Sequence, residues 1–218
     1  MNNEVLGTLE EQVVPKQTAL LIIDPQNDFC ASDGAVSKIM GTDASRNQRA
    51  VPRLNRFIER AREEHLLIVW TKSIVEPYRA RVSFKARGFI QDARGKNINF
   101  VQEGTNGADW YPAMTKPLPE EHVITKYHYD AFADTNLDLL LSSMGMKTLL
   151  FTGFNTNVCV ETAARHAYIK GYYVIAVADC TDTVTEQEYD AALFNIKTYF
   201  GKVATSEQIA KIWNARQK

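Results

Sequence analysis

The stretch from Thr18 to Ile23 reads TALLII, and Asp24 and Pro25 follow it directly. This continuous apolar run has the length of a single strand and is too short for a helix that crosses a domain core. Because the run does not alternate between apolar and polar residues, both of its faces are expected to be buried, as in the centre of a parallel sheet. TALLII therefore predicts an α/β fold with neighbouring strands on both sides of this one.

Further strands and helices alternate along the rest of the chain. About three to four turns of amphipathic helix are predicted where apolar residues recur at helical spacing, namely at Val51, Leu54, Phe57, Ile58 and Ala61. The other predicted strands cover 66–70, 122–125, 148–152, 173–178 and 202–205. The other predicted helices run from Asp134 or Thr135 to Gly145, from Asn157 to Lys170, from the capping box Thr185–Glu188 to Gly201, and onward from Ser206. Such alternation is typical of parallel βαβ units, so we expect a doubly wound, mainly parallel sheet with helices on both faces.

One long segment, 72–118, interrupts this alternation. It is polar and contains four glycines, and it is longer than an ordinary connection in a compact domain. We interpret it as a lid or an assembly arm inserted into a single domain that spans 1–218.

Composition narrows the classes of partner. The 25 Lys and Arg residues nearly balance the 26 Asp and Glu residues, so no global field favours nucleic acid or an anionic membrane as a partner. The N-terminus lacks the basic and apolar regions of a signal peptide, and no apolar run reaches membrane-spanning length, so a cytoplasmic location is expected. Neither GxGxxG after the first strand nor GxxxxGK[ST] occurs, which disfavours nucleotide binding. The three cysteines are widely spaced and are expected to be free thiols.

Three reactive side chains follow strands that should end at the same edge of the sheet. Asp24 terminates the first strand, Lys126 terminates the strand 122–125, and Cys159 lies in the turn after 148–152. Ligands bind beyond the carboxyl ends of strands in open parallel sheets, so we expect the three to meet there. Each residue alone has a simpler interpretation, as a turn former, a solvated lysine or a small buried hydrophobe. It is the combination that indicates chemistry.

The combination suits hydrolysis of an amide. Cys159 supplies a nucleophile, and its place at a helix N-terminus beside the Lys126 ammonium predicts a lowered thiol pKa. Asp24 is expected to accept the thiol proton and pass it to the leaving amine. The backbone N–H groups of Asn155 and Cys159 are candidates for an oxyanion hole. No cofactor is needed.

Longer motifs around these residues are recognisable. The segments ALLIIDPQNDF, VITKYHYDAF and GFNTNVCVETAARHAYIKGY resemble the isochorismatase-like cysteine hydrolase superfamily, over the chain from Ala19 to Gly201. That resemblance implies a Rossmann-like fold, a catalytic triad of Asp24, Lys126 and Cys159, and a cis peptide between Phe154 and Asn155. It also suggests a homotetramer. The cysteine favours amide cleavage over the vinyl-ether cleavage of isochorismatases proper.

Within this superfamily, the segments DAALFNIKTYFG and TGFNTNVCVE are similar to those of ureide hydrolases of the ureidoacrylate, biuret and triuret type. Nicotinamidases of the superfamily hold a metal with an Asp and His cluster soon after the first motif. In this chain the first histidine is His65, in a predicted helix, so we predict no metal.

Candidates for substrate binding are weaker, because each has an equally good structural explanation. The motifs place Phe29, Phe132 and Phe154 where they would line a pocket, although ordinary core packing explains them as well. Tyr129 follows the lysine motif, as does His128, for which a solvated loop position is the simpler interpretation. Arg87 in the long segment is the first candidate for binding a substrate carboxylate.

The sequence therefore predicts an amidohydrolase that cleaves a C–N bond of a small linear ureide through a cysteine acyl-enzyme. The triad does not separate this function from an amidase of the same superfamily acting on N-carbamoyl amino acids, a cyclic amide or nicotinamide. A catalytically idle assembly protein is a third hypothesis, which the intact Asp24, Lys126 and Cys159 argue against.

Overall fold

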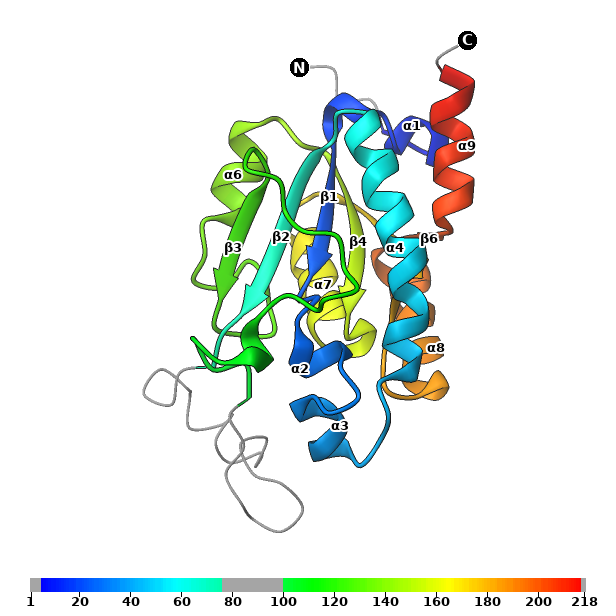
Figure 1. Cartoon of the computed structure of the whole chain (residues 1–218). Coiled ribbons are helices and arrows are strands. Elements are labelled where there is room, and N and C mark those ends of the chain that lie inside the picture. Colours follow the sequence, from blue (N-terminus) through cyan, green and yellow to red (C-terminus); the bar gives the residue numbers. More distant parts are fainter. Residues whose placement is uncertain (1–4, 76–99, 217–218) are drawn as a thin grey trace.

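The structure is a computed structural model that describes residues 5–75 and 100–216 (Figure 1). Within these residues, six strands form one sheet in the order β3-β2-β1-β4-β5-β6, and every neighbouring pair is parallel. The strands are β1 (Thr18–Ile23), β2 (Leu67–Ser73), β3 (His122–Lys126), β4 (Thr148–Phe154), β5 (Tyr173–Asp182) and β6 (Gly201–Ala204). The predicted doubly wound α/β fold is confirmed, and TALLII is a fully buried central strand.

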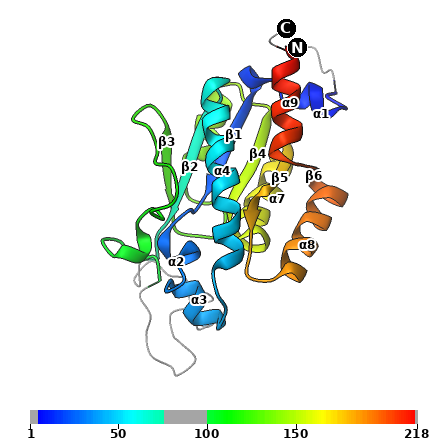
Figure 2. The ribbon, with the colours of Figure 1, turned by 45° about the vertical axis from the view of Figure 1, so that its right-hand side comes forward.

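Helices cover both faces of the sheet. On one face, α4 (Ser45–Glu63) and α9 (Ser206–Arg216) lie side by side, and α7 (Glu161–Ile169) packs on the other (Figures 1 and 2). Alternate residues of β1 divide between the two resulting cores: Leu20 and Ile22 pack with α4, whereas Leu21 and Ile23 pack with α7. The remaining helices are α1 (Leu9–Gln12), α2 (Asn27–Cys30), α3 (Ala35–Met40), α6 (Leu137–Ser143) and α8 (Glu186–Asn195).

Several elements extend beyond the bounds that periodicity predicts. The helix expected from Val51 begins at Ser45, and its buried face includes the polar Asn47. Strand β5 continues four residues past Ala178, beyond a register shift where it pairs with β4. The helix expected from Asn157 begins with a π-helical turn, Thr156–Val160, before α7. The extensions of α4 and β5 consist mostly of polar residues, so a search for regularly spaced apolar residues does not detect them.

The described part of the long segment is packed rather than open. Val101, Ala108 and Met114 lie in the core on the α4 face, and a short 3-10 turn forms at Asn106–Ala108. The rest of the segment, 76–99, lies outside the described residues. Part of the segment thus contributes to the core, and the interpretation of 72–118 as a lid or an assembly arm stays a prediction.

Strands β1 and β4 approach closely at the point where the chain changes its winding direction. Gly153 of β4 has φ +97°, and a Cβ built on it would lie 2.1 Å from the carbonyl oxygen of Ile23. Only glycine meets both conditions without displacing the neighbouring strand. In a sheet of this order, this is the topological switch point, where ligand sites form.

Candidate active site

The three reactive residues meet at the carboxyl edge of the sheet. Asp24 follows β1, Lys126 is the last residue of β3, and Cys159 lies in the π-helical turn after β4. Short helices α2 and α3 lie below this edge in Figure 1. The sequence-based expectation that these side chains come together is confirmed as geometry, while their catalytic roles remain a proposal.

Asp24 and Lys126 form a buried ion pair. Lys126 Nζ lies 2.7 Å from Asp24 Oδ2, and neither side chain is exposed. Thr71 of β2 fixes the carboxylate from the other side, because its hydroxyl donates to Oδ1 at 2.6 Å and accepts the Asp24 N–H at 3.1 Å. Asp24 itself has φ 47°, a left-handed conformation that aspartate tolerates better than most residues. Sequence periodicity gives no indication of this role of Thr71.

Lys126 is held by four neighbours. Besides Asp24, its ammonium donates to the carbonyl oxygens of His128 at 2.9 Å and Tyr129 at 3.3 Å, and lies 3.5 Å from Cys159 Sγ. Burial by itself would lower the pKa of Lys126, but the negative charge of Asp24 and the hydrogen bonds to Asp24 and Cys159 raise it above its usual value. The lysine therefore stays charged and cannot act as a proton acceptor near neutral pH.

Cys159 differs from the expectation in its acidity. Burial is the largest effect and, with the Asp24 carboxylate, outweighs the stabilisation by Lys126, so that the thiol pKa is raised to about 12. The prediction of a lowered pKa was wrong, because it counted the cation and the helix terminus but not the loss of solvent. The resting nucleophile is thus a neutral thiol beside a carboxylate that can accept its proton.

The turn that carries the nucleophile has the predicted backbone form. The Phe154–Asn155 peptide is cis, as expected. The Asn155 carbonyl accepts the N–H groups of Val158 and Val160, which closes the π-helical turn around Cys159. Thr156 supports the turn through a 2.8 Å hydrogen bond to Thr181 of β5. The oxyanion role of the Asn155 and Cys159 N–H groups stays a prediction.

The three candidate phenylalanines do not form one wall. Phe29 and Phe154 belong to the core on the α4 face, whereas Phe132 belongs to the opposite core together with Cys159. Phe132 also lies against the His166 ring, with centroids 5.0 Å apart. Of the three, only Phe132 shares a hydrophobic cluster with the nucleophile.

The remaining candidates follow the lysine motif or belong to the long segment. Tyr129 contributes its carbonyl oxygen to Lys126, and its side chain is 38% exposed. His128 Nε2 lies 2.9 Å from Asp134 Oδ2 at the surface, as the simpler interpretation of a solvated loop histidine suggests. Arg87 lies outside the described residues.

The residues directly after Asp24 hold the packed end of the long segment. Gln26 binds the Ser73 backbone and the Ala108 carbonyl, and the Asp28 carboxylate accepts the N–H groups of Ala35 and Val101. The polar residues of the DPQND motif other than Asp24 therefore position chain around the site. The sequence motif alone does not distinguish them from catalytic groups.

Two further observations concern ligand sites. Within residues 5–75 and 100–216, no three His, Cys, Asp or Glu side chains are grouped to hold a metal ion, so the prediction of a metal-free enzyme is not contradicted.

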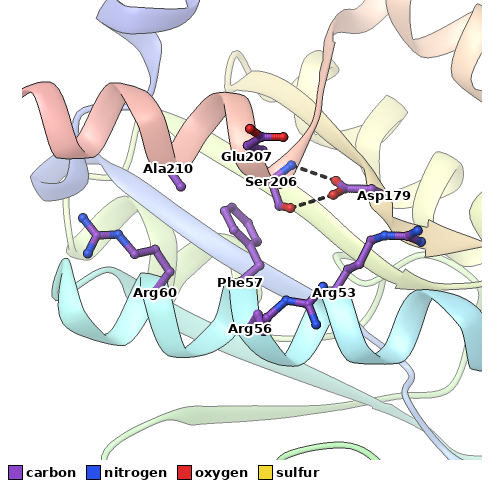
Figure 3. Close-up of a pocket in the computed structure, with 8 residues that line it drawn as sticks. All are labelled: Arg53, Arg56, Phe57, Arg60, Asp179, Ser206, Glu207 and Ala210. Carbon is purple, nitrogen blue, oxygen red and sulfur yellow. Dashed lines mark hydrogen bonds between the residues drawn. The ribbon is translucent and has the colours of Figure 1, made fainter.

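A pocket of about 340 Å³ lies between α4 and α9, lined by residues other than the three reactive ones. In Figure 3 Arg60 points away from Arg53 and Arg56, and the carboxylate of Asp179 accepts hydrogen bonds from the Ser206 N–H and hydroxyl. This arrangement does not converge on one ligand.

No helix in the described ranges is long and apolar enough to cross a membrane.

Comparisons with known proteins agree with the fold and the motifs. The isochorismatase domain model matches residues 18–208. The ureidoacrylate amidohydrolase RutB of Enterobacter sp. (strain 638) is 31% identical over 201 residues, which cover 88% of this chain and 86% of the relative. The relative of the same name from Klebsiella pneumoniae subsp. pneumoniae is 31% identical over 208 residues, covering 88% and 85%.

Solved structures give the same picture. An isochorismatase-like hydrolase from Alkaliphilus metalliredigens superimposes with a TM-score of 0.72 at 27% identity, covering 90% of this chain and 99% of the other. An N-carbamoylsarcosine amidase from Thermoplasma acidophilum (TM-score 0.70, 21% identity, 88% and 97% covered) and a nicotinamidase from Bacillus subtilis (TM-score 0.68, 23% identity, 86% and 99% covered) share the fold alone. On the extent of the family match and the identity to curated relatives, this chain belongs to the isochorismatase family of hydrolases.

Proposed function

We propose that this enzyme is a cysteine amidohydrolase that cleaves a C–N bond of a small linear ureide, with Asp24, Lys126 and Cys159 as its catalytic residues. One observation carries the proposal: a single buried ammonium, Lys126 Nζ, lies 2.7 Å from a carboxylate and 3.5 Å from a thiol. These are a base, a nucleophile and a fixed cation, which together are what thiol-dependent amide hydrolysis requires.

Acylation begins with the neutral thiol. As Cys159 Sγ attacks the ureide carbonyl carbon, the thiol proton moves to the Asp24 carboxylate and an S–C bond forms. Lys126 stays charged and stabilises the developing negative charge on sulfur, while the N–H groups of Asn155 and Cys159 are assigned to the carbonyl oxygen. The C–N bond then breaks, and Asp24 returns its proton to the departing ammonia or amine.

Deacylation reuses the same groups. Water attacks the thioester carbonyl, Asp24 takes a proton from that water, and the C–S bond breaks to release the acid. The sulfur leaves as a thiolate beside Lys126 and recovers its proton from Asp24, because its pKa of about 12 favours the thiol. Asp24 is therefore the acid–base catalyst, because it takes up a proton and returns it in each half of the reaction, whereas Lys126 stays charged throughout.

The substrate class is supported by the curated relatives. The name ureidoacrylate amidohydrolase belongs to proteins 31% identical to this chain over most of its length. The deep burial of the thiol, which is 3% exposed, favours a small substrate. The fold shared with an N-carbamoylsarcosine amidase and a nicotinamidase keeps those amides as rival substrates.

An ammonia-release screen tests the proposal. The purified protein is incubated with ureidoacrylate, biuret, triuret, N-carbamoyl amino acids and nicotinamide, and Cys159→Ala serves as the matched control. The expected result is Cys159-dependent release that is fastest with one linear ureide. Fastest turnover of nicotinamide or an N-carbamoyl amino acid would replace the ureide assignment. Absence of turnover with every amide would favour the idle assembly protein.

The candidate ureides differ in charge, because ureidoacrylate is an anion whereas biuret and triuret are neutral. We retain Arg87 as the candidate partner of a substrate carboxylate. If Arg87 pairs with a desolvated carboxylate, Arg87→Ala costs about 2 kcal/mol or more in kcat/KM for the anionic substrate and little for a neutral one. Equally small losses with both substrate types would remove Arg87 from the binding site.

We also retain the homotetramer as a proposal. Aromatic and aliphatic side chains at the end of α7 and in the segment after α8 are exposed, notably Tyr168, Ile169 and Tyr199. Exposed apolar groups gathered on one surface are typical of a protein–protein interface.

A further inference from the structure

The side chain of Asn155 has a donor whose direction is set by a chain of two hydrogen bonds. Asn47 Nδ2, on α4, lies 2.8 Å from the Phe29 carbonyl oxygen and 2.8 Å from Asn155 Oδ1. A backbone carbonyl only accepts hydrogen bonds, so the Asn47 atom that faces Phe29 must be the nitrogen. Because the same nitrogen also faces Asn155, the Asn155 atom at that contact must be the oxygen.

This logic fixes both amide orientations without reference to a substrate. Flipping Asn47 would place its oxygen against the Phe29 carbonyl and lose that hydrogen bond, even if Asn155 flipped with it to keep the bond between the two amides. In the present orientation the buried Asn47 Oδ1 is left without a hydrogen-bond donor. Keeping two bonds at the expense of one acceptor is the better arrangement, since each hydrogen bond adds to stability.

Asn155 Nδ2 is consequently directed away from Asn47 and has no acceptor among residues 5–75 and 100–216. Asn155 is only 7% exposed, yet its nitrogen is not among the completely enclosed polar atoms without a partner. Buried amide groups nearly always find hydrogen-bond partners, so an unpaired but accessible donor on so buried a side chain is suited to bind a ligand. Asn155 also precedes the turn that holds Cys159, so that it stands four positions before the nucleophile in the chain.

We propose that Asn155 Nδ2 donates a hydrogen bond to a carbonyl or carboxylate oxygen of the substrate other than the oxygen under attack, and that Asn47 is the positioning residue that aims it. This assignment rests on the proposed function and adds a specificity residue to it. Asn47 does not touch the substrate. It acts by holding the Asn155 oxygen, so that the nitrogen faces the site.

The test is a cycle of variants measured with the ureide that wild-type enzyme turns over fastest. Asn155→Ala is expected to raise KM about tenfold and to change kcat less than threefold, because it removes a contact made equally in the bound substrate and the transition state. Asn47→Leu, of similar volume, is expected to raise KM severalfold in the wild-type background and not at all in the Asn155→Ala background. Asn55→Leu is the matched control, since Asn55 lies on the same helix and binds the backbone of Ala113 and Thr115 instead. Its KM should stay within about twofold of wild type.

A second variant covers a failure of Asn155→Ala to fold. Asn155→Asp keeps the acceptor for Asn47 and puts an oxygen where the donor was, so its KM should rise at least as much. An unchanged KM in either Asn155 variant would overturn the proposal, as would an Asn47→Leu effect of equal size in both backgrounds. These outcomes differ from failure of the proposed function, in which wild-type enzyme itself would hydrolyse no ureide.

Discussion

Lys126 and Asp24 form an ion pair in which neither side chain is exposed to solvent. Removing one partner of such a pair leaves an uncompensated buried charge, which is far more destabilising than removing both. The pair therefore links the stability of the fold to the chemistry of the site, and the two effects can be separated by variants.

The first prediction follows from this linkage. Asp24→Asn and Lys126→Met are each expected to lower the free energy of unfolding by about 3 to 5 kcal/mol, because each leaves one buried charge alone. The double variant should be more stable than either single variant, since it buries no charge. Chemical denaturation of the four proteins measures this, and additive losses in the double variant would show that the two charges do not compensate one another.

The second prediction concerns the nucleophile. Cys159→Ser should fold normally, bind substrate and hydrolyse it at least about a hundredfold more slowly, because a hydroxyl is much harder for Asp24 to deprotonate than a thiol. Steady-state kinetics give the rate, and calorimetric titration gives the binding. Activity within about tenfold of wild type would reject Cys159 as the nucleophile.

The third prediction uses the raised thiol pKa. With a pKa of about 12, the thiolate fraction of Cys159 grows about tenfold for each pH unit between pH 7 and 10, so the rate of alkylation by iodoacetamide should rise in parallel without a plateau. Mass spectrometry of the Cys159 peptide follows the reaction. A plateau reached below pH 9 would mean that Lys126 holds the resting sulfur as a thiolate after all. Lys126→Met should slow the alkylation at every pH, because the cation that favours the thiolate is gone.

The fourth prediction addresses metals. The proposed steps use only Asp24, Lys126 and Cys159, so dialysis against EDTA should leave kcat unchanged. Addition of zinc, iron or manganese afterwards should have no effect. A loss of rate that one of these ions restores would assign the enzyme a metal-dependent mechanism.

The fifth prediction concerns assembly. Replacing Ile169, which is 78% exposed, and Tyr199 by glutamate should convert a tetramer into smaller species, because both side chains lie in the proposed interface. Light scattering after gel filtration measures the mass. Met40→Glu on α3 is the matched control and should leave the mass unchanged, since α3 lies beyond the carboxyl edge of the sheet, whereas Ile169 and Tyr199 precede β5 and β6 at the opposite edge. A monomeric wild-type protein would rule out the tetramer directly.

Much of the architecture could be predicted from the sequence, because buried parallel strands such as TALLII and amphipathic helices carry simple patterns. The meeting of Asp24, Lys126 and Cys159 could be predicted too, since all three follow strands of one parallel sheet. What could not be predicted depends on contacts between distant segments. The bridge from Asn47 to Asn155 joins residues 108 positions apart and has no local signal.

The acidity of the thiol shows the same limit. The sequence indicates a helix start at Cys159 and predicts that Lys126 meets it at the sheet edge, and both of these lower a thiol pKa. The opposing effect, burial, depends on how completely the core on the α7 face closes around Cys159, and this follows only from the packed structure. Sequence reasoning therefore found the right groups but estimated their balance wrongly.

The contact between Gly153 and the Ile23 carbonyl bears on how this scaffold acquires new activities. Main chain sets the spacing between the strands that carry the base and the nucleophile, so exchange of side chains in the surrounding loops leaves that spacing intact. A directed-evolution library confined to loop positions can thus explore new substrates without losing the reaction, whereas any library that diversifies Gly153 should return mostly inactive clones.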